Sequence, residues 1–148
     1  MKIYLDVCCL NRPFDDLTQD RVRLESEAVL TILNHGQTEN WHLLNSEVIE
    51  IEISKIPEDD KRLKVTILST LLKSKVVIDE GIERRAIELE KLGFKSFDAL
   101  HISCAEKGEA DVFLTTDDNL LQKALQNKNL LKVRVENPVR WLMEVIGR

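Results

Sequence analysis

Short apolar runs and segments of helical periodicity alternate along the first third of the chain. Ile3-Tyr4-Leu5 is typical of a buried strand, and it ends at an acid, Asp6. Apolar residues then recur at three- and four-residue intervals from Val22 to Leu33, which predicts a helix that ends at His35-Gly36. Trp41-His42-Leu43-Leu44 predicts a second strand. The chain therefore begins with a strand, a helix and a strand.

The same two patterns continue to the C-terminus. In chain order they predict a helix from Asn45-Ser46 to Pro57, a helix from Glu58 to about Lys73, a short apolar break at Val76-Val77-Ile78, a helix from Ile82 to Leu92, a helix from Phe97 to about Lys107 with Ser96 as its N-cap, a strand at Val112-Phe113-Leu114, a helix from Asn119 to Gln126, an edge strand from Lys132 to Val135, and a last helix that Pro138 opens and that runs to Ile146. Strands that alternate with helices predict a parallel sheet covered on both faces. We therefore expect an α/β fold: a three-layer α/β/α sandwich with a central parallel sheet of four to five strands and a helical insertion from Glu58 to Leu92.

The composition fits one folded domain. The chain has 148 residues, within the roughly 100–200 that one domain usually contains, and no repeat or linker divides it. We therefore expect residues 1–148 to form a single domain. Hydrophobic residues make up 43% and charged residues 32%, which is typical of a globular protein and excludes a disordered chain.

Cysteine usage and the N-terminus indicate the compartment. Cys8, Cys9 and Cys104 are odd in number and lack the spacing of a zinc site, so we expect buried free thiols in a reducing environment. No run approaches the roughly 18 apolar residues that a membrane span needs, and Asp6 comes too early for a signal peptide. These features predict a cytoplasmic protein that does not contact a membrane.

The net charge argues at first against a nucleic-acid partner. Lys and Arg number 21 and Asp and Glu number 26, which gives −5. Proteins that hold phosphates usually carry a basic surplus. The positions of the acids change this picture, because several of them stand where strands end.

Acids follow three of the predicted strands. In chain order they are Asp6, Glu47, Glu50, Glu52, Asp117 and Asp118. A further acid, Asp98, lies in the first turn of an almost wholly apolar helix. In an open parallel sheet the functional crevice lies beyond the carboxyl ends of the strands. We therefore expect several of these carboxylates to converge there.

The acids also have ordinary structural interpretations. Asp98 could favour the positive end of its helix, and Asp117 could cap the next helix. Asp6 is harder to explain in this way, because a carboxylate at the inner end of an apolar strand is partly desolvated and needs a cation or hydrogen bonds. No Lys or Arg recurs beside these acids. The economical partner for converging carboxylates is a hard divalent cation such as Mg²⁺ or Mn²⁺.

Four segments, in order along the chain, carry the motifs of one protein family. The first strand ends at Asp6, Ser46 precedes Glu52 by six residues, Asp98-Ala99-Leu100-His101 opens an apolar helix, and Phe113-Leu114-Thr115-Thr116-Asp117 closes a strand. Asp117 follows Asp98 by 19 residues. In these motifs the chain resembles the PIN-domain nucleases, which include the toxins of bacterial and archaeal toxin–antitoxin pairs. The resemblance covers essentially the whole chain.

The resemblance implies a PIN-like fold and a site of four acids. Carried over by position, Asp6, Glu52, Asp98 and Asp117 are the catalytic and metal-binding residues, with Mg²⁺ or Mn²⁺ as the cofactor. The implied reaction is endonucleolytic hydrolysis of RNA phosphodiester bonds by a water that the metal orients and deprotonates. Two residues turn a helix by roughly 200°, so only one of Glu50 and Glu52 can face the other acids. Glu50 takes the place of Glu52 if the helix starts later or is irregular.

Residues beside the motifs are candidates for supporting roles. Thr116 could hydrogen-bond the water or an acid, or be only a β-branched residue at a strand end. Asn11 or Arg12 could contact a substrate phosphate, although for Arg12 we favour ordinary loop surface. Asp118 could be an outer acid, although we favour the first residue of the next helix.

Two further positions complete the comparison with the family. Many members have Ser or Thr directly after the first Asp, where this chain has Val7 and Cys8, so the usual hydroxyl is missing. His101 lies three residues after Asp98 and hence on the same helix face. It could touch the site, but we favour a hydrogen-bonded histidine of the core.

Other functions stay open. A haloacid-dehalogenase-like phosphatase also begins with a strand that ends in Asp, but it needs a second Asp two residues later, where this chain has Cys8. A non-catalytic PIN-like module would hold RNA or a protein partner without cutting. The resemblance implies an RNA substrate, a cognate antitoxin as a candidate partner, and a homodimer for which the helices between Glu58 and Leu92 are the candidate surface.

The charge of −5 does not exclude RNA. Two bound Mg²⁺ ions would offset the four acids of the site, and Arg12, Arg21 and Arg23 are candidates to meet phosphates. Without a divalent metal, we expect the acidic cleft to repel RNA.

Overall fold

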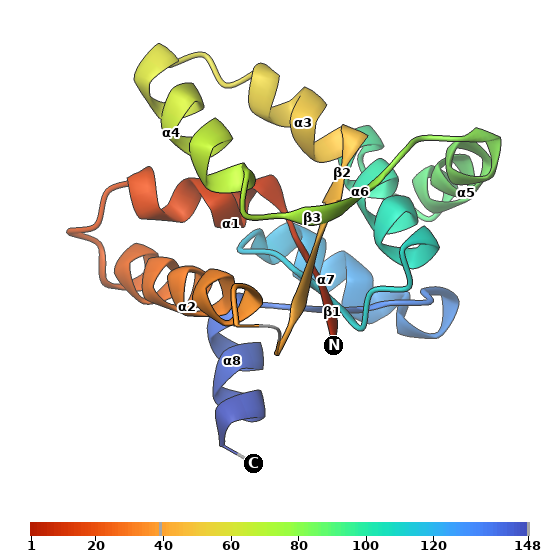
Figure 1. Cartoon of the computed structure of the whole chain (residues 1–148). Helices are drawn as coiled ribbons and strands as arrows, with labels where there is room; N and C mark the ends of the chain where they lie inside the picture. The colour runs from red at the N-terminus through yellow and green to blue at the C-terminus, as the bar shows by residue number, and fades with distance from the viewer. Residues whose placement is uncertain (39, 148) are drawn as a thin grey trace.

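The computed structural model describes residues 1–38 and 40–147 and contains one five-stranded sheet in that part of the chain (Figure 1). The strands are β1 (Lys2–Leu5), β2 (His42–Ser46), β3 (Lys73–Val76), β4 (Val112–Leu114) and β5 (Arg134–Glu136). Their order across the sheet is β3-β2-β1-β4-β5, and each neighbouring pair is parallel. The predicted parallel sheet is confirmed, with five strands.

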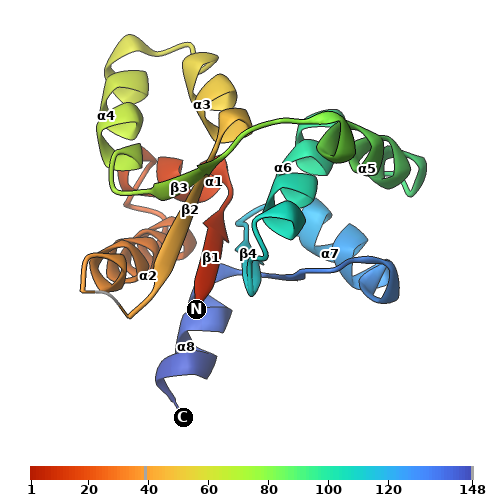
Figure 2. The ribbon, with the colours of Figure 1, turned by 45° about the vertical axis from the view of Figure 1, so that its right-hand side comes forward.

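Helices cover both faces of the sheet. They are α1 (Val7–Asn11), η1 (Arg12–Phe14), α2 (Asp20–Gly36), α3 (Glu47–Ser54), α4 (Asp59–Ser69), α5 (Glu80–Lys91), α6 (Ser96–Lys107), α7 (Asp118–Gln126), η2 (Lys128–Leu130) and α8 (Pro138–Ile146). Figure 2 shows α1, α2 and α4 on one side of the sheet and α5, α6 and α7 on the other. The C-terminal α8 packs against α2. The predicted α/β/α sandwich is confirmed.

The order in which the chain visits the strands explains these layers. From β1 the chain moves to β2 and β3 on one side, and then to β4 and β5 on the other side of β1. Parallel crossovers are right-handed, so crossovers in opposite directions place their helices on opposite faces. The change of direction lies between β1 and β4, and open α/β sheets bind ligands beyond the strand ends at such a switch point. Asp6 follows β1 and Asp117 follows β4, so both acids stand at this point.

The two strands beside the switch point are fully buried. Residues 3–5 of β1 and all of β4 are between 0% and 1% exposed. Strands that are covered on both faces become continuous apolar runs, which is why the sequence pattern identified these two. The backbone N–H of Asp6 donates to the carbonyl of Leu114 at 2.9 Å, so the strand pairing continues to the acid itself.

The helical insertion predicted from Glu58 to Leu92 is wrong at its centre. The helix α4 ends at Ser69 rather than near Lys73, and Lys73–Val76 forms β3, an edge strand of the main sheet that pairs with β2. The first three residues of β3 are exposed. An edge strand of Lys and Ser protects the sheet from further pairing and shows no apolar pattern. The apolar break at Val76-Val77-Ile78 marked only the end of this strand.

Smaller differences lie at helix starts. The pattern predicted no helix directly after the first strand, but α1 and η1 occupy this segment. Both helices are too short to show a periodic pattern in the sequence. Ser96 is the first residue of α6 rather than its N-cap, a position that Lys95 takes without a side-chain bond. The three cysteines are free, as expected, with Cys8 only partly buried. Among the described residues, no helix is long and apolar enough to cross a membrane.

Close packing of α2 on β2 leads to a prediction. A Cβ at Gly36 would lie 2.4 Å from Cδ1 and 2.7 Å from Cγ of the buried Leu43. We expect Gly36→Ala to lower the free energy of unfolding by about 1–3 kcal/mol, because Leu43 must move within a packed core. The control is Gly81→Ala in α5, where the nearest atom is Asp79 Oδ1 at 3.3 Å. Urea unfolding followed by circular dichroism compares the two, and equal stability of both variants would contradict this packing.

Candidate active site

Asp6 lies at the carboxyl end of β1 and is 6% exposed. Its Oδ1 accepts a hydrogen bond from the backbone N–H of Val7 at 2.8 Å, as the N-cap of α1. Its Oδ2 accepts from Thr115 Oγ1 at 2.8 Å and from Cys8 Sγ at 3.3 Å. Burial is the largest cause of a raised pKa at Asp6, which these hydrogen bonds only partly oppose. The carboxylate is therefore tightly held but costly to ionise.

Thr115 supplies the hydroxyl that the residues after Asp6 lack. It reaches Asp6 from the end of β4, 109 positions further along the chain. Cys8 Sγ also lies 3.3 Å from Thr115 Oγ1, so the three side chains form one hydrogen-bonded group. Thr116 was the predicted supporting threonine, whereas Thr115 is the one that contacts Asp6. Two threonines at a strand end were the only signal, and which of them faces Asp6 depends on how the chain leaves β4.

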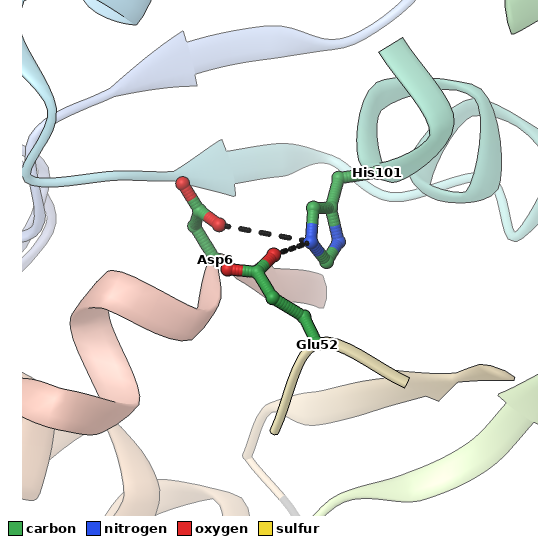
Figure 3. Close-up of side chains that lie close together, drawn as sticks. All are labelled: Asp6, Glu52 and His101. Atoms are coloured by element: carbon green, nitrogen blue, oxygen red, sulfur yellow. Dashed lines mark hydrogen bonds and ion pairs between the residues drawn. The ribbon is translucent and has the colours of Figure 1, made fainter. Parts of the chain in front are cut away.

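His101 lies between Glu52 and Asp6 and contacts both carboxylates (Figure 3). Glu52 projects from α3 and His101 from α6. His101 Nε2 lies 2.5 Å from Glu52 Oε1 and 3.9 Å from Asp6 Oδ1. One potential ligand atom from each of the three residues lies within 4.8 Å of the other two. We call Asp6, Glu52 and His101 the acid–histidine cluster.

The geometry of α3 separates Glu52 from Glu50. Glu50 is exposed and pairs with Lys75 Nζ at 3.0 Å, on the side of β3. The side chain of Glu52 is 32% exposed and is directed to His101. The helix is continuous over Glu47–Ser54, so the alternative of a late start does not arise. Glu52, and not Glu50, therefore lies beside Asp6.

His101 belongs to the core and to the site at once, whereas the sequence analysis treated these as alternatives and favoured the core. It is 0% exposed, and its Nδ1 lies 2.7 Å from the hydroxyl of Tyr4. Burial lowers the pKa of His101, but the hydrogen bond to Glu52 and the negative charges of Asp6 and its neighbours outweigh burial and raise this pKa overall. The imidazole thus carries the positive potential nearest to the acids.

Asp98 lies half-buried in the first turn of α6. Its pKa is raised to about 6, with burial as the largest cause, followed by the negative charges of Asp6 and Asp117. Within the described part of the chain, neither Asp98 nor Asp117 joins the acid–histidine cluster at its 4.8 Å spacing. Asp98 therefore stands beside the cluster, close enough to be repelled by it.

Asp117 caps α7, which is the ordinary interpretation that the sequence offered. Its Oδ1 accepts from the backbone N–H groups of Asn119 at 2.9 Å and of Leu120 at 3.3 Å. Its negative charge still raises the pKa of Asp98. Asp117 therefore caps α7 and also lies close enough to the other acids to act on Asp98.

The supporting candidates lie around this edge with different surroundings. Thr116 is buried, and its backbone N–H donates to Cys8 Sγ at 3.3 Å. Asp118 is the first residue of α7 and pairs with Arg21 at 2.7 Å. Asn11 ends α1, and its Oδ1 is buried without a hydrogen-bond partner among the described residues.

Glu25 of α2 holds Arg12 and Arg21, the first two arginines after Asp6 in the chain. It is 1% exposed and accepts from Arg12 Nε at 2.8 Å, from Arg21 Nε at 3.2 Å and from Asn137 Nδ2 at 2.7 Å. The expectation that Arg12 belongs to ordinary loop surface is wrong, because this ion pair fixes it against α2. Arg23 also pairs with an acid, one turn before it in α2. The three arginines expected to meet phosphates are thus already paired with carboxylates.

Comparison of the chain with models of protein families gives a match. A family model described as the PIN domain matches residues 3–125. The chain belongs to the PIN domain family. The matched span contains Asp6, Glu52, Asp98 and Asp117 and ends within α7. A search of curated proteins gave no match.

Solved structures share the fold over almost their whole length. The PIN domain is similar to a chain in the crystal structure of VapBC2 from Rickettsia felis bound to a DNA fragment from their promoter, with a TM-score of 0.58, 16% identity, and coverage of 93% of this chain and 98% of that chain. It is also similar to a chain of VapBC-1 from nontypeable Haemophilus influenzae, with a TM-score of 0.55, 14% identity, and coverage of 93% and 98%. At these identities the likeness shows the fold.

The acids of this PIN domain fit a hard divalent cation. Such ions prefer carboxylate oxygens, and Asp6, Glu52 and Asp98 offer them from three different elements. Burial raises the pKa values of Asp6 and Asp98, and repulsion from other acids raises them further. A cation between these carboxylates would offset that repulsion. His101 Nε2 is already bonded to Glu52, so the imidazole serves the carboxylate rather than an ion.

The raised pKa of Asp98 predicts how the metal-free protein responds to pH. Its folded pKa of about 6 lies above the usual 3.8. Ionised Asp98 therefore destabilises the fold above about pH 6, and this effect disappears as the pH falls toward about 4. We expect Asp98→Asn to be more stable than the wild type at about pH 8 and equal to it at about pH 4. Urea unfolding in the presence of a chelator measures the difference.

The control for this experiment is Asp118→Asn. The pKa of Asp118 is lowered by its hydrogen bonds from Arg21, so this substitution is expected to act in the opposite direction at about pH 8. An Asp98→Asn variant that is no more stable than the wild type at that pH would contradict the position of Asp98 among the other acids.

Proposed function

We propose that this PIN domain is a divalent-metal-dependent endoribonuclease that hydrolyses RNA phosphodiester bonds with Asp6, Glu52, Asp98 and Asp117, and that Mg²⁺ or Mn²⁺ is its cofactor. The observation that carries the proposal is the convergence of carboxylates from β1, α3 and α6 at the switch point of the sheet. Among the described residues, only His101 forms an ion pair with Asp6 or Glu52. The cluster therefore keeps negative charge for a cation.

The residues around the acids prepare them for catalysis. A bound divalent cation supplies an activated water and positive charge against the reacting phosphate. Thr115 and Cys8 hold Oδ2 of Asp6, and His101 holds Oε1 of Glu52. Groups that are fixed before the substrate arrives need no reorganisation during the reaction. Asp98, half-buried and repelled by Asp6 and Asp117, is a further acid whose charge a cation would stabilise.

We also propose that the protein is the toxin of a toxin–antitoxin pair, acts in the cytoplasm, and has a cognate antitoxin as its protein partner. The support is the set of motifs shared with toxins of the PIN family, together with the fold shared with chains of VapBC2 and VapBC-1. A homodimer stays a prediction. The helices between Glu58 and Leu92 do not offer one surface for it, because α4 and α5 lie on opposite sides of the sheet (Figure 2); α4 exposes Leu63 and Ile67 and α5 exposes Ile87, each more than half exposed.

Removal of single acids tests the nuclease proposal. We expect Asp6→Asn, Glu52→Gln and Asp98→Asn each to reduce cleavage of single-stranded RNA by about 100-fold or more, because each removes a metal-binding carboxylate. The matched control is Glu50→Gln, which changes an acid of the same helix that pairs with Lys75 and should retain activity. A chelator should stop cleavage, and added Mg²⁺ or Mn²⁺ should restore it. Gel analysis of labelled RNA measures all of these rates.

Two results would reject the nuclease assignment. Equal cleavage by the wild type and the three acid variants would indicate a contaminating nuclease. Absence of cleavage by a wild-type protein that still binds RNA would favour the non-catalytic module. Release of inorganic phosphate from a monoester would instead support the phosphatase alternative, although Cys8 stands where that chemistry needs a second Asp.

Growth of a bacterial host tests the toxin proposal. We expect induced expression of the wild type to arrest growth, and expression of Asp6→Asn to leave growth unchanged, because arrest requires cleavage of cellular RNA. Co-expression of the protein encoded by the neighbouring gene should restore growth if that protein is the antitoxin. Normal growth with an active wild-type nuclease present would leave the ribonuclease and remove the toxin role.

A further inference from the structure

A chain of hydrogen bonds links Ser46, at the start of α3, to Glu52 in the same helix by way of Tyr4 and His101. Ser46 Oγ caps α3 by accepting from the backbone N–H of Ile49 at 3.0 Å. The same oxygen lies 2.7 Å from the hydroxyl of Tyr4, which lies 2.7 Å from His101 Nδ1. His101 Nε2 then bonds Glu52 Oε1. We call Ser46, Tyr4, His101 and Glu52 the Tyr4 circuit.

Packing fixes the middle of the Tyr4 circuit. Ser46, Tyr4 and His101 are each 0% exposed. The ring of Tyr4 stacks on Phe113 with a centroid distance of 5.3 Å and an interplanar angle of 10°. Its edge contact with the imidazole of His101 has a centroid distance of 5.7 Å. With both rings held in this way, the Tyr4 hydroxyl has a fixed place from which to reach His101 Nδ1.

Counting protons gives the Tyr4 circuit a direction. The carboxylate of Glu52 has no proton to give, so His101 Nε2 must be the donor. In the neutral ring, which has only one N–H, Nδ1 is an acceptor and the Tyr4 hydroxyl donates to it; in the protonated ring Nδ1–H donates to the Tyr4 oxygen. Ser46 in turn donates to the oxygen of Tyr4. With the neutral ring, each donor in the Tyr4 circuit has an acceptor.

We propose that Tyr4 is a positioning residue of the metal site: its hydroxyl bonds His101 Nδ1 and so orients the imidazole, and the Nε2–H of that ring holds Glu52 beside Asp6. The inference rests on the proposed function, because it concerns a carboxylate that would bind the cation. The Glu52 side chain is 32% exposed and has several rotatable bonds, so fixing it only when the ion arrives would cost conformational entropy. Outer partners of metal-binding side chains typically change metal affinity by about 10–100-fold.

Tyr4→Phe tests this role with the smallest change, because it keeps the ring and its stack on Phe113 and removes only the hydroxyl. We expect the dissociation constant for Mg²⁺, measured by isothermal titration calorimetry, to rise by about 10-fold or more. The matched control is Ser103→Ala, which removes a buried hydroxyl from α6 that bonds the carbonyl of Ile82 at 2.9 Å. This control should lower thermal stability and leave the Mg²⁺ affinity unchanged, which separates positioning from a general loss of structure.

The tautomer gives a readout that needs neither metal nor activity. In alkaline buffer, ¹⁵N NMR of the His101 ring should show a protonated Nε2 and an unprotonated Nδ1 in the wild type, and a mixture of tautomers in Tyr4→Phe. The variant His101→Gln offers an amide N–H in place of Nε2–H. In that background Tyr4→Phe should cause no further loss of Mg²⁺ affinity, because Tyr4 acts through His101.

The outcomes separate the two proposals. A proton on Nδ1 in place of Nε2 in the wild type in alkaline buffer, or a Tyr4→Phe variant that binds Mg²⁺ as tightly as the wild type, would overturn the role of Tyr4 and leave the ribonuclease proposal untouched. A wild type that binds neither Mg²⁺ nor Mn²⁺ would overturn the proposed function and, with it, the role of Tyr4 at a metal.

Discussion

Repulsion between partly buried carboxylates is the constraint on which this site depends. The fold brings Asp6, Glu52 and Asp98 to one edge of the sheet. Burial is the largest cause of the raised pKa values of Asp6 and Asp98, and repulsion from Glu52 at Asp6 and from Asp6 at Asp98 raises them further. The buried strands β1 and β4 supply the stability that tolerates this charge. Functional sites often contain groups that destabilise the folded protein, because a bound substrate or metal supplies the interaction that stabilises those groups.

The same constraint explains where the arginines are. Arg12 and Arg21 come from the segment that follows Asp6 and would be near enough in sequence to neutralise it. Glu25, almost completely buried, accepts hydrogen bonds from both, and Asp118 takes a second contact with Arg21. The ion pairs of Glu25 tie η1 to α2, and among the described residues they leave His101 as the basic side chain that contacts Asp6 and Glu52. Acids and bases close together in sequence are thus sorted into two separate groups.

The sequence predicted the parts of the fold that repeat a pattern. Buried strands such as residues 3–5 and the long periodic helix α2 follow from apolar spacing, and the acids after the strands follow from the topology of a parallel sheet. The edge strand β3 was missed because Lys73 and Lys75 show no apolar pattern, and α1 because one turn and a half has no period to detect. Side-chain choices depend on tertiary contacts. Nothing local in the sequence shows that Thr115 rather than Thr116 meets Asp6, or that Arg12 is drawn to Glu25.

Two local periods account for the way the site is assembled. Side chains two residues apart in a strand share a face, so Tyr4 and the acid that follows β1 both project toward α6. Residues three apart in a helix share a face, so Asp98 and His101 both project back toward β1. The contact between Tyr4 and His101 shows that these two faces meet. One histidine can therefore satisfy the tyrosine with Nδ1 and the acid of a third element, Glu52, with Nε2. The position of His101 in the core and its role in the site are therefore linked, because the buried hydrogen bond between the Tyr4 hydroxyl and Nδ1 fixes the orientation of the ring and so places Nε2 beside the acids.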